Sequence, residues 1–209
     1  MLILLAIFLL PALYTSPGQV DPNLFAQPGA HLGILIQNVP RLLLLLYLME
    51  LDGGEWIGRF GLSIDIKRLL PASLGVAFIL FALGAGTNWA SHALGVAGEP
   101  PFELSSPPLS AYILSGFSFL SVGYMEELFF RSYAITRLRQ LGLSDRASIL
   151  VGALLFSAGH LYQGAEGLLF ALLAALALGF LFDRYRRAHP LALGHAVYNY
   201  VGLLISGVP

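Results

Sequence analysis

The stretch GLLFALLAALALGFLF, Gly167–Phe182, contains no charged residue and decides the fold class. Similar apolar runs recur along the chain, in which 57% of the 209 residues are hydrophobic and 11% are charged. A soluble globular domain is about 45–50% apolar and about 25% charged. Since a membrane crossing needs about 20 mostly apolar residues, the sequence predicts an all-α fold, a polytopic transmembrane helix bundle.

Clusters of Pro, Gly and charged residues separate the apolar segments. We predict one membrane domain over residues 1–209 with about seven spans, and an eighth element or a re-entrant piece near Gly84–Gly98 stays open. The seven spans are expected at residues 2–15, 31–51, 68–91, 108–130, 146–162, 165–183 and 189–207. N-terminal helices would occupy residues 1–91, and residues 137–144 would form an interfacial connector.

The basic residues indicate the topology independently of hydropathy. Every second predicted loop is basic, and the loops between them carry no Lys or Arg. The basic loops contain Arg59, Lys67 and Arg68, then Arg137, Arg139 and Arg146, then Arg184, Arg186 and Arg187. Cytoplasmic loops carry the excess of Lys and Arg. We therefore expect an integral protein of the plasma (inner) membrane with a cytoplasmic N-terminus and the C-terminus on the far side.

Charge and cysteine content exclude several function classes. The formal net charge of −1 leaves no basic stripe for nucleic acid, which is not expected as a partner. The chain has no Cys, which removes thiol catalysis, disulfides and Cys-ligated zinc.

Two basic residues fall outside the basic loops: Arg41 within the second predicted span, and Arg131 near the end of the fourth. Ionisable groups within a membrane are expensive and by default mark function or a paired contact. For Arg41 a structural explanation is at least as good as a functional one: it lies near a tilted helix end or extends its side chain to the interface. Arg131 differs because acidic residues lie one turn before it.

The segment Tyr124-Met-Glu-Glu-Leu-Phe-Phe-Arg131 places two adjacent carboxylates inside an apolar helix. Adjacent helical residues point about 100° apart, so Glu126 and Glu127 are not expected to face one partner. Glu127 and Arg131 have the favourable i,i+4 order for an ion pair, which would support the helix. Glu126 is then left without a local counter-charge and suits a general base. Alternatively, all three residues form one packing network between helices.

Three further polar residues lie in later spans: His160, His195 and Asn199. Each alone is explained as a satisfied core residue or as interhelical hydrogen bonding. A rise of about 1.5 Å per residue, however, places Glu126 about 17–20 Å from the basic loop that follows it. By the same rise His160 lies about 21 Å from Arg146, and His195 and Asn199 about 12 and 18 Å from Arg187. A similar depth in three helices favours a shared site.

Two chemistries fit such a site. Glu126 and His160 could deprotonate a water for attack on an amide carbonyl, while His195 and Asn199 donate hydrogen bonds to the oxyanion. Alternatively, Glu126, His160 and His195 could hold a divalent metal such as zinc with an open water position. The cofactor is therefore none or one such metal. The chain contains no H-E-x-x-H, G-x-S-G or G-x-G-D signature of other proteases.

The ordered motifs resemble the CAAX protease and bacteriocin-processing (CPBP) family, intramembrane endopeptidases related to the type II CAAX prenyl protease. They are Glu126-Glu127-Leu-Phe-Phe-Arg131, Phe156-Ser-Ala-Gly-His160 and His195-Ala-Val-Tyr-Asn199, within a core of about residues 108–203. The resemblance implies that Glu126 and His160 activate the water and that His195 and Asn199 form the oxyanion site. It also implies a large cavity that opens toward the cytoplasm and the lipid. Whether a metal takes part stays open, because family members are described either as metalloproteases or as metal-independent glutamate proteases.

An intramembrane endopeptidase is thus the leading hypothesis, with membrane lipids and a peptide or membrane-protein substrate, prenylated or leader-bearing, as partners. A non-catalytic membrane immunity or scaffold protein is the first alternative. A small proton-coupled transporter with Glu126 as the relay is less favoured, because the sequence has no duplicated halves.

Overall fold

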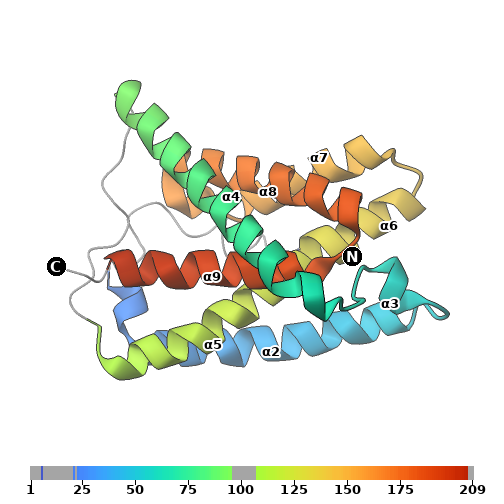
Figure 1. Ribbon diagram of the computed structural model, residues 1–209, viewed down its shortest axis with the longest axis horizontal. Helices are drawn as coiled ribbons and strands as arrows, with labels where there is room; N and C mark the ends of the chain where they lie inside the picture. Colours follow the sequence, from blue (N-terminus) through green and yellow to red (C-terminus); the bar gives the residue numbers. More distant parts are fainter. Residues whose placement is uncertain (1–5, 7–20, 22, 96–106, 207–209) are drawn as a thin grey trace.

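The computed structural model describes residues 6, 21, 23–95 and 107–206. These residues form helices and no β-strand (Figure 1), which confirms the all-α prediction for the described part. The long helices are α2 (Pro28–Glu50), α4 (Ile66–Ala93), α5 (Leu109–Glu126), α7 (Asp145–Ala158), α8 (Gly164–Tyr185) and α9 (Ala188–Ser206). The short ones are η1 (Leu24–Ala26), α3 (Trp56–Arg59), η2 (Glu127–Ala134), α6 (Ile135–Gln140) and η3 (Leu161–Gln163).

Four helices in the described residues are long and apolar enough to cross a membrane. They are Pro28–Glu50, Ile66–Ala93, Leu109–Gln140 and Leu161–Tyr185. The six predicted spans from residue 31 onward all appear as helices, but α7 and α9 are not among these four. The predicted span at 2–15 lies, apart from Ala6, outside the described residues. No re-entrant piece interrupts the described part of the 84–98 region, because α4 is continuous to Ala93.

The fourth span differs from its prediction. We expected it to end at residue 130 and a connector to occupy 137–144, but α5, η2 and α6 run on as one helix to Gln140. The eight residues of η2 are all buried, including Arg131, whose charge is offset by Glu127. Arg131 is therefore a core residue inside this long helix, and only 141–144 connects α6 to α7.

Helix α7 is short and ends beside a cavity. Its 14 residues span about 21 Å at the usual rise, less than the roughly 30 Å of a hydrocarbon core. His160 and the short helix η3 follow, and Gly164, with a φ of +76°, begins α8. Irregular backbone at membrane depth is tolerated where it lines a cavity or is buried in protein, and this break does line a cavity.

Helix α9 lies between α4 and α5 and contacts both (Figure 1). Two glycines allow the close approach. A Cβ at Gly123 would lie 2.4 Å from the Ala192 carbonyl oxygen, and a Cβ at Gly194 would lie 2.5 Å from the Ser73 carbonyl oxygen. Small residues let membrane helices pack backbone to backbone. Gly123 thereby brings the Glu126 end of α5 close to α9 beside His195, and Gly194 brings the same part of α9 close to α4.

Ion pairs join the predicted basic loops at one end of the bundle. Asp52 pairs with Arg59 and Arg137, and Arg187 lies 3.1 Å from Asp65. Arg139 pairs with Asp183 across from α6 to α8. These contacts place all three basic segments at the same end, as their alternation along the sequence predicted.

Candidate active site

A cavity of about 1530 Å³ lies among α4, α5, α8 and α9, beside the break after α7. Its walls are mostly apolar, with large contributions from Phe81, Trp89, Phe119 and Phe170. Within these walls lie all four residues that the sequence proposes for catalysis: Glu126, His160, His195 and Asn199. They come from α5, from the residue after α7, and from α9, so the fold brings together residues that are up to 73 positions apart.

His195 connects the two adjacent carboxylates. Its Nδ1 donates to Glu127 Oε1 at 2.9 Å, and its Nε2 lies 3.8 Å from Glu126 Oε2. The expectation that Glu126 and Glu127 would not meet one partner is therefore wrong. An imidazole presents nitrogens on two sides of its ring, so two diverging carboxylates can both reach it. Glu126 accordingly does have a nearby partner, which the sequence reading did not give it.

Glu127 has a second contact. Its Oε2 lies 3.0 Å from Arg131 Nε, so the predicted i,i+4 ion pair is present. Both side chains are buried, Glu127 completely and Arg131 with 2% exposed. The Arg131 guanidinium also lies 4.3 Å from the centre of the Phe156 ring. A buried charge needs a partner, and Glu127 provides one to Arg131 while it holds His195.

Glu126 and Glu127 differ in exposure, and this difference limits what each carboxylate can contact. The Glu126 side chain keeps 21% of its surface exposed and lines the cavity, whereas Glu127 is completely buried behind His195. A substrate in the cavity can touch Glu126 but not Glu127. Glu127 can act only through His195.

Hydrogen bonding fixes the orientation of the His160 ring. Its Nδ1 donates to the Phe156 carbonyl oxygen at 2.9 Å, one helical turn back. A carbonyl only accepts, so the neutral ring carries its lone pair on Nε2. The ring packs against Phe156, with ring centres 4.4 Å apart, and stacks on Tyr162 at 6.3 Å. His160 is therefore held in the tautomer that can accept a proton at Nε2.

Asn199 lies one turn beyond His195 on the same face of α9, as the i,i+4 spacing predicts. In the described part of the chain its amide forms no hydrogen bond, and it lines the cavity. An amide N–H without a protein partner is available to a ligand. Asn199 therefore has the position of a donor to something bound in the cavity.

Two contacts at the site were not found from the sequence. Tyr162 lines the cavity beside His160 and accepts a hydrogen bond from Gln163 Nε2 at 3.2 Å. The His195–Glu127 bond joins residues 68 positions apart. The E-E pair marks the position of both carboxylates, but nothing in the local sequence indicates which of them meets the histidine.

The candidate metal ligands do not converge in this structure. Among the described residues, no three His, Asp or Glu side chains are grouped as a metal site requires. The Nδ1 bonds of His195 and His160 do not bear on this, because a histidine that binds a metal through Nε2 commonly donates its Nδ1 proton to a carboxylate or a carbonyl. Glu126, His160 and His195 are not grouped as a three-ligand zinc shell in this structure, and no step below uses a metal.

Comparison with known proteins adds a family. Residues 108–201, just under half of the chain, match the family model described as "Type II CAAX prenyl endopeptidase Rce1-like". The match confirms the resemblance carried by the three motifs, and together with the four apolar helices it supports an integral membrane protein. No curated protein and no solved structure matches the chain significantly.

Proposed function

Since residues 108–201 match the Rce1-like endopeptidase family, we propose that this protein hydrolyses a peptide bond of a membrane-associated substrate inside its bundle. The substrate class that this family suggests is a peptide with a prenylated CAAX terminus, and a leader-bearing peptide is the alternative. We further propose that the protein resides in the plasma (inner) membrane, with the end that carries the basic loops in the cytoplasm.

In the proposed reaction Glu126 and His160 activate a water. Glu126 is the carboxylate that reaches the cavity, and His160 offers Nε2 as a proton acceptor. Both side chains line the same cavity, and no hydrogen bond or ion pair joins them in the described residues. Proton removal as the water attacks is worth typically about 10²–10⁴-fold in rate. The proton is then delivered to the leaving amine.

His195 and Asn199 would stabilise the oxyanion that forms on the attacked carbonyl. Because His195 Nδ1 donates to Glu127, its Nε2 can donate as well only when the ring is an imidazolium. The carboxylates of Glu126 and Glu127 flank the ring and would stabilise that charge. Fixed donors aimed at a developing charge are often the largest single contribution to such catalysis.

The observation that carries the proposal is the convergence of Glu126, His160, His195 and Asn199 in one cavity of mostly apolar walls. Structural polar contacts would join helices to one another. Here Asn199 and the exposed part of Glu126 face the cavity instead, where a bound molecule can meet them.

The test is cleavage of a fluorescent prenylated CAAX peptide, and of a peptide library, by the purified protein in detergent. We expect Glu126→Gln and His160→Ala each to reduce kcat/KM by at least about 100-fold. Glu50→Gln is the matched control, since Glu50 is the exposed last residue of α2. Cleavage that persists in both site variants would overturn the proposal, and failure of the wild type to cleave any peptide would favour the non-catalytic scaffold.

A further inference from the structure

Arg41 lies in the middle of a membrane-spanning helix. It is about 14 Å from Glu50 and about 20 Å from Pro28 at the rise of a helix, so the reading that placed it near a helix end is wrong. Of the eleven basic residues, nine lie in the basic segments and Arg131 pairs with Glu127. Arg41 is left as an intramembrane cation, and in the described residues it pairs with no carboxylate.

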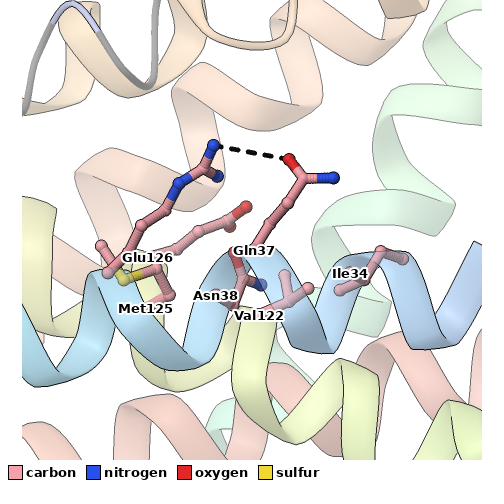
Figure 2. Close-up of a pocket in the computed structure, with 7 residues that line it drawn as sticks. Ile34, Gln37, Asn38, Val122, Met125 and Glu126 are labelled. Atoms are coloured by element: carbon pink, nitrogen blue, oxygen red, sulfur yellow. Dashed lines mark hydrogen bonds between the residues drawn. The ribbon is translucent and has the colours of Figure 1, made fainter.

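The side chain of Arg41 lines a second cavity, of about 230 Å³, between α2 and α5. Figure 2 shows this cavity with Gln37, Asn38, Val122 and Glu126 around it. The dashed line marks a bond from Arg41 Nη2 to Gln37 Oε1, which at 3.4 Å is long. Most of the donors of the guanidinium fork thus remain available to a ligand.

The small cavity adjoins the large one. Ile34, Val122 and Glu126 line both of them, so Glu126 stands at their common wall. A molecule bound along α5 can therefore touch Glu126 from the large cavity and Arg41 from the small one.

We propose that Arg41, with Gln37 beside it, binds the C-terminal carboxylate of the peptide substrate while the scissile bond lies at Glu126. Arginine pairs with carboxylates through two parallel N–H bonds, and it keeps its charge when buried. This inference rests on the proposed function, because it assigns a substrate group to the same site. It makes Arg41 a specificity-determining residue in the half of the chain outside the family match.

Depth and length both favour a peptide terminus as the occupant. A lipid phosphate lies at the surface of a hydrocarbon core about 30 Å thick, hence about 15 Å from the midplane, whereas Arg41 lies near the middle of α2. In a C-a-a-X sequence three residues follow the Cys, and an extended tripeptide reaches about 10 Å. The scissile bond and the carboxylate of such a peptide are therefore about 10 Å apart, and Glu126 and Arg41 line one cavity.

Charge gives a further reason. A peptide carboxylate that enters this space approaches Glu126, which carries the same charge when it acts as a base. Like charges in a medium of low dielectric constant repel strongly. Arg41 lines the same cavity as Glu126 and would offset that repulsion, so its effect should depend on whether the peptide ends in an acid.

The experiment compares two peptides that differ only at the C-terminus, one a free acid and one an amide. Their affinity is measured by fluorescence polarisation with the Glu126→Gln protein, which holds peptide without cleaving it, alone and combined with Arg41→Gln or Arg41→Lys. Without the Arg41 change we expect the acid to bind roughly 10- to 100-fold more tightly than the amide. Arg41→Gln should abolish this preference with the amide affinity unchanged, and Arg41→Lys should restore part of it.

Arg146→Gln is the matched control, because Arg146 is exposed at the start of α7. It should leave the preference intact. An equal loss of affinity for both peptides in Arg41→Gln would overturn the proposal, because Arg41 would then act on the fold or on Glu126. Cleavage by the wild type without any acid preference would refute carboxylate recognition but keep the hydrolase. Acid-selective, Arg41-dependent binding without cleavage would refute the hydrolase but keep the recognition.

Discussion

The Nδ1 atom of His195 lies 2.9 Å from Oε1 of Glu127, a carboxylate that is completely buried and that also pairs with Arg131. One side chain therefore orients a residue of the cavity and neutralises a cation in the core. Glu126, its neighbour in the sequence, lies in the cavity wall. The two adjacent glutamates should consequently respond very differently to the same substitution.

We expect Glu127→Gln to lower the melting temperature strongly. It leaves the Arg131 cation buried without a counter-charge, and breaking a buried ion pair costs about 3–5 kcal/mol. The measurement is thermal unfolding in detergent, followed by tryptophan fluorescence. Glu126→Gln, on the more exposed neighbour, should leave the melting temperature nearly unchanged.

The double variant Glu127→Gln/Arg131→Met supplies the control for this prediction. Since it removes both charges, it should recover part of the lost stability. A double variant less stable than Glu127→Gln alone would mean that Arg131 has another essential partner.

Asn199→Ala should lower kcat by about 10²–10³-fold and change KM much less, as expected for loss of an oxyanion donor. The amide has no hydrogen bond to the described protein, so the melting temperature should stay close to that of the wild type. Steady-state kinetics on the cleaved peptide measures both constants. A raised KM at constant kcat would instead assign Asn199 to substrate binding.

Acid should weaken the basic end of the bundle. Hydrogen bonds from Arg137 and Arg59 lower the pKa of Asp52 from 3.8 to about 2. A carboxyl whose pKa is lower in the folded protein stabilises the fold above its unfolded pKa, and this contribution is lost as the pH falls through the folded value. The melting temperature should therefore fall between about pH 4 and pH 2. In Asp52→Asn the fall in that window should be smaller, and an identical fall in both proteins would show that Asp52 contributes nothing.

Chelators should leave cleavage intact. Among the described residues, no three His, Asp or Glu side chains are grouped closely enough to hold a metal ion. Activity assayed after dialysis against EDTA, with metal analysis of the same sample, checks this expectation. Activity lost with EDTA and recovered with zinc would show that the ligands regroup around a metal.

The sequence predicts the helices well where hydropathy alone determines them. α2, α4 and α8 each match an apolar run with charged or Pro-rich ends. It ends the fourth span too early, at residue 130, whereas the helix continues through Arg131, which pairs with Glu127 as predicted, to Gln140. The sequence also does not indicate that α7 ends at Ala158, four residues before the predicted end of that span. His160 and Gly164 mark a break in the helix only once the structure shows that they line the cavity.

The site follows the same pattern. Residue type, order and helical spacing suffice to select Glu126, His160, His195 and Asn199, and the structure places all four at one cavity. Their catalytic roles, and the single membrane domain over residues 1–209, stay predictions. The contact between His195 and Glu127 depends on how α9 packs against α5, which the close approach at Gly123 determines.

The π-helical segment η2 lies between α5 and α6, two parts of one long helix that pack against different neighbours. Upstream, α5 is in register with α9 through Gly123 and Glu126. Downstream, α6 is in register with the basic end through Arg137 and Arg139. A π-turn closes its hydrogen bonds one residue later than an α-turn, so it shifts the phase between these two registers. Deleting one residue from Glu127–Ala134 would rotate α6 by about 100° relative to α5. The helix could then keep Glu126 beside His195, or keep the ion pairs of Arg137 and Arg139, but not both.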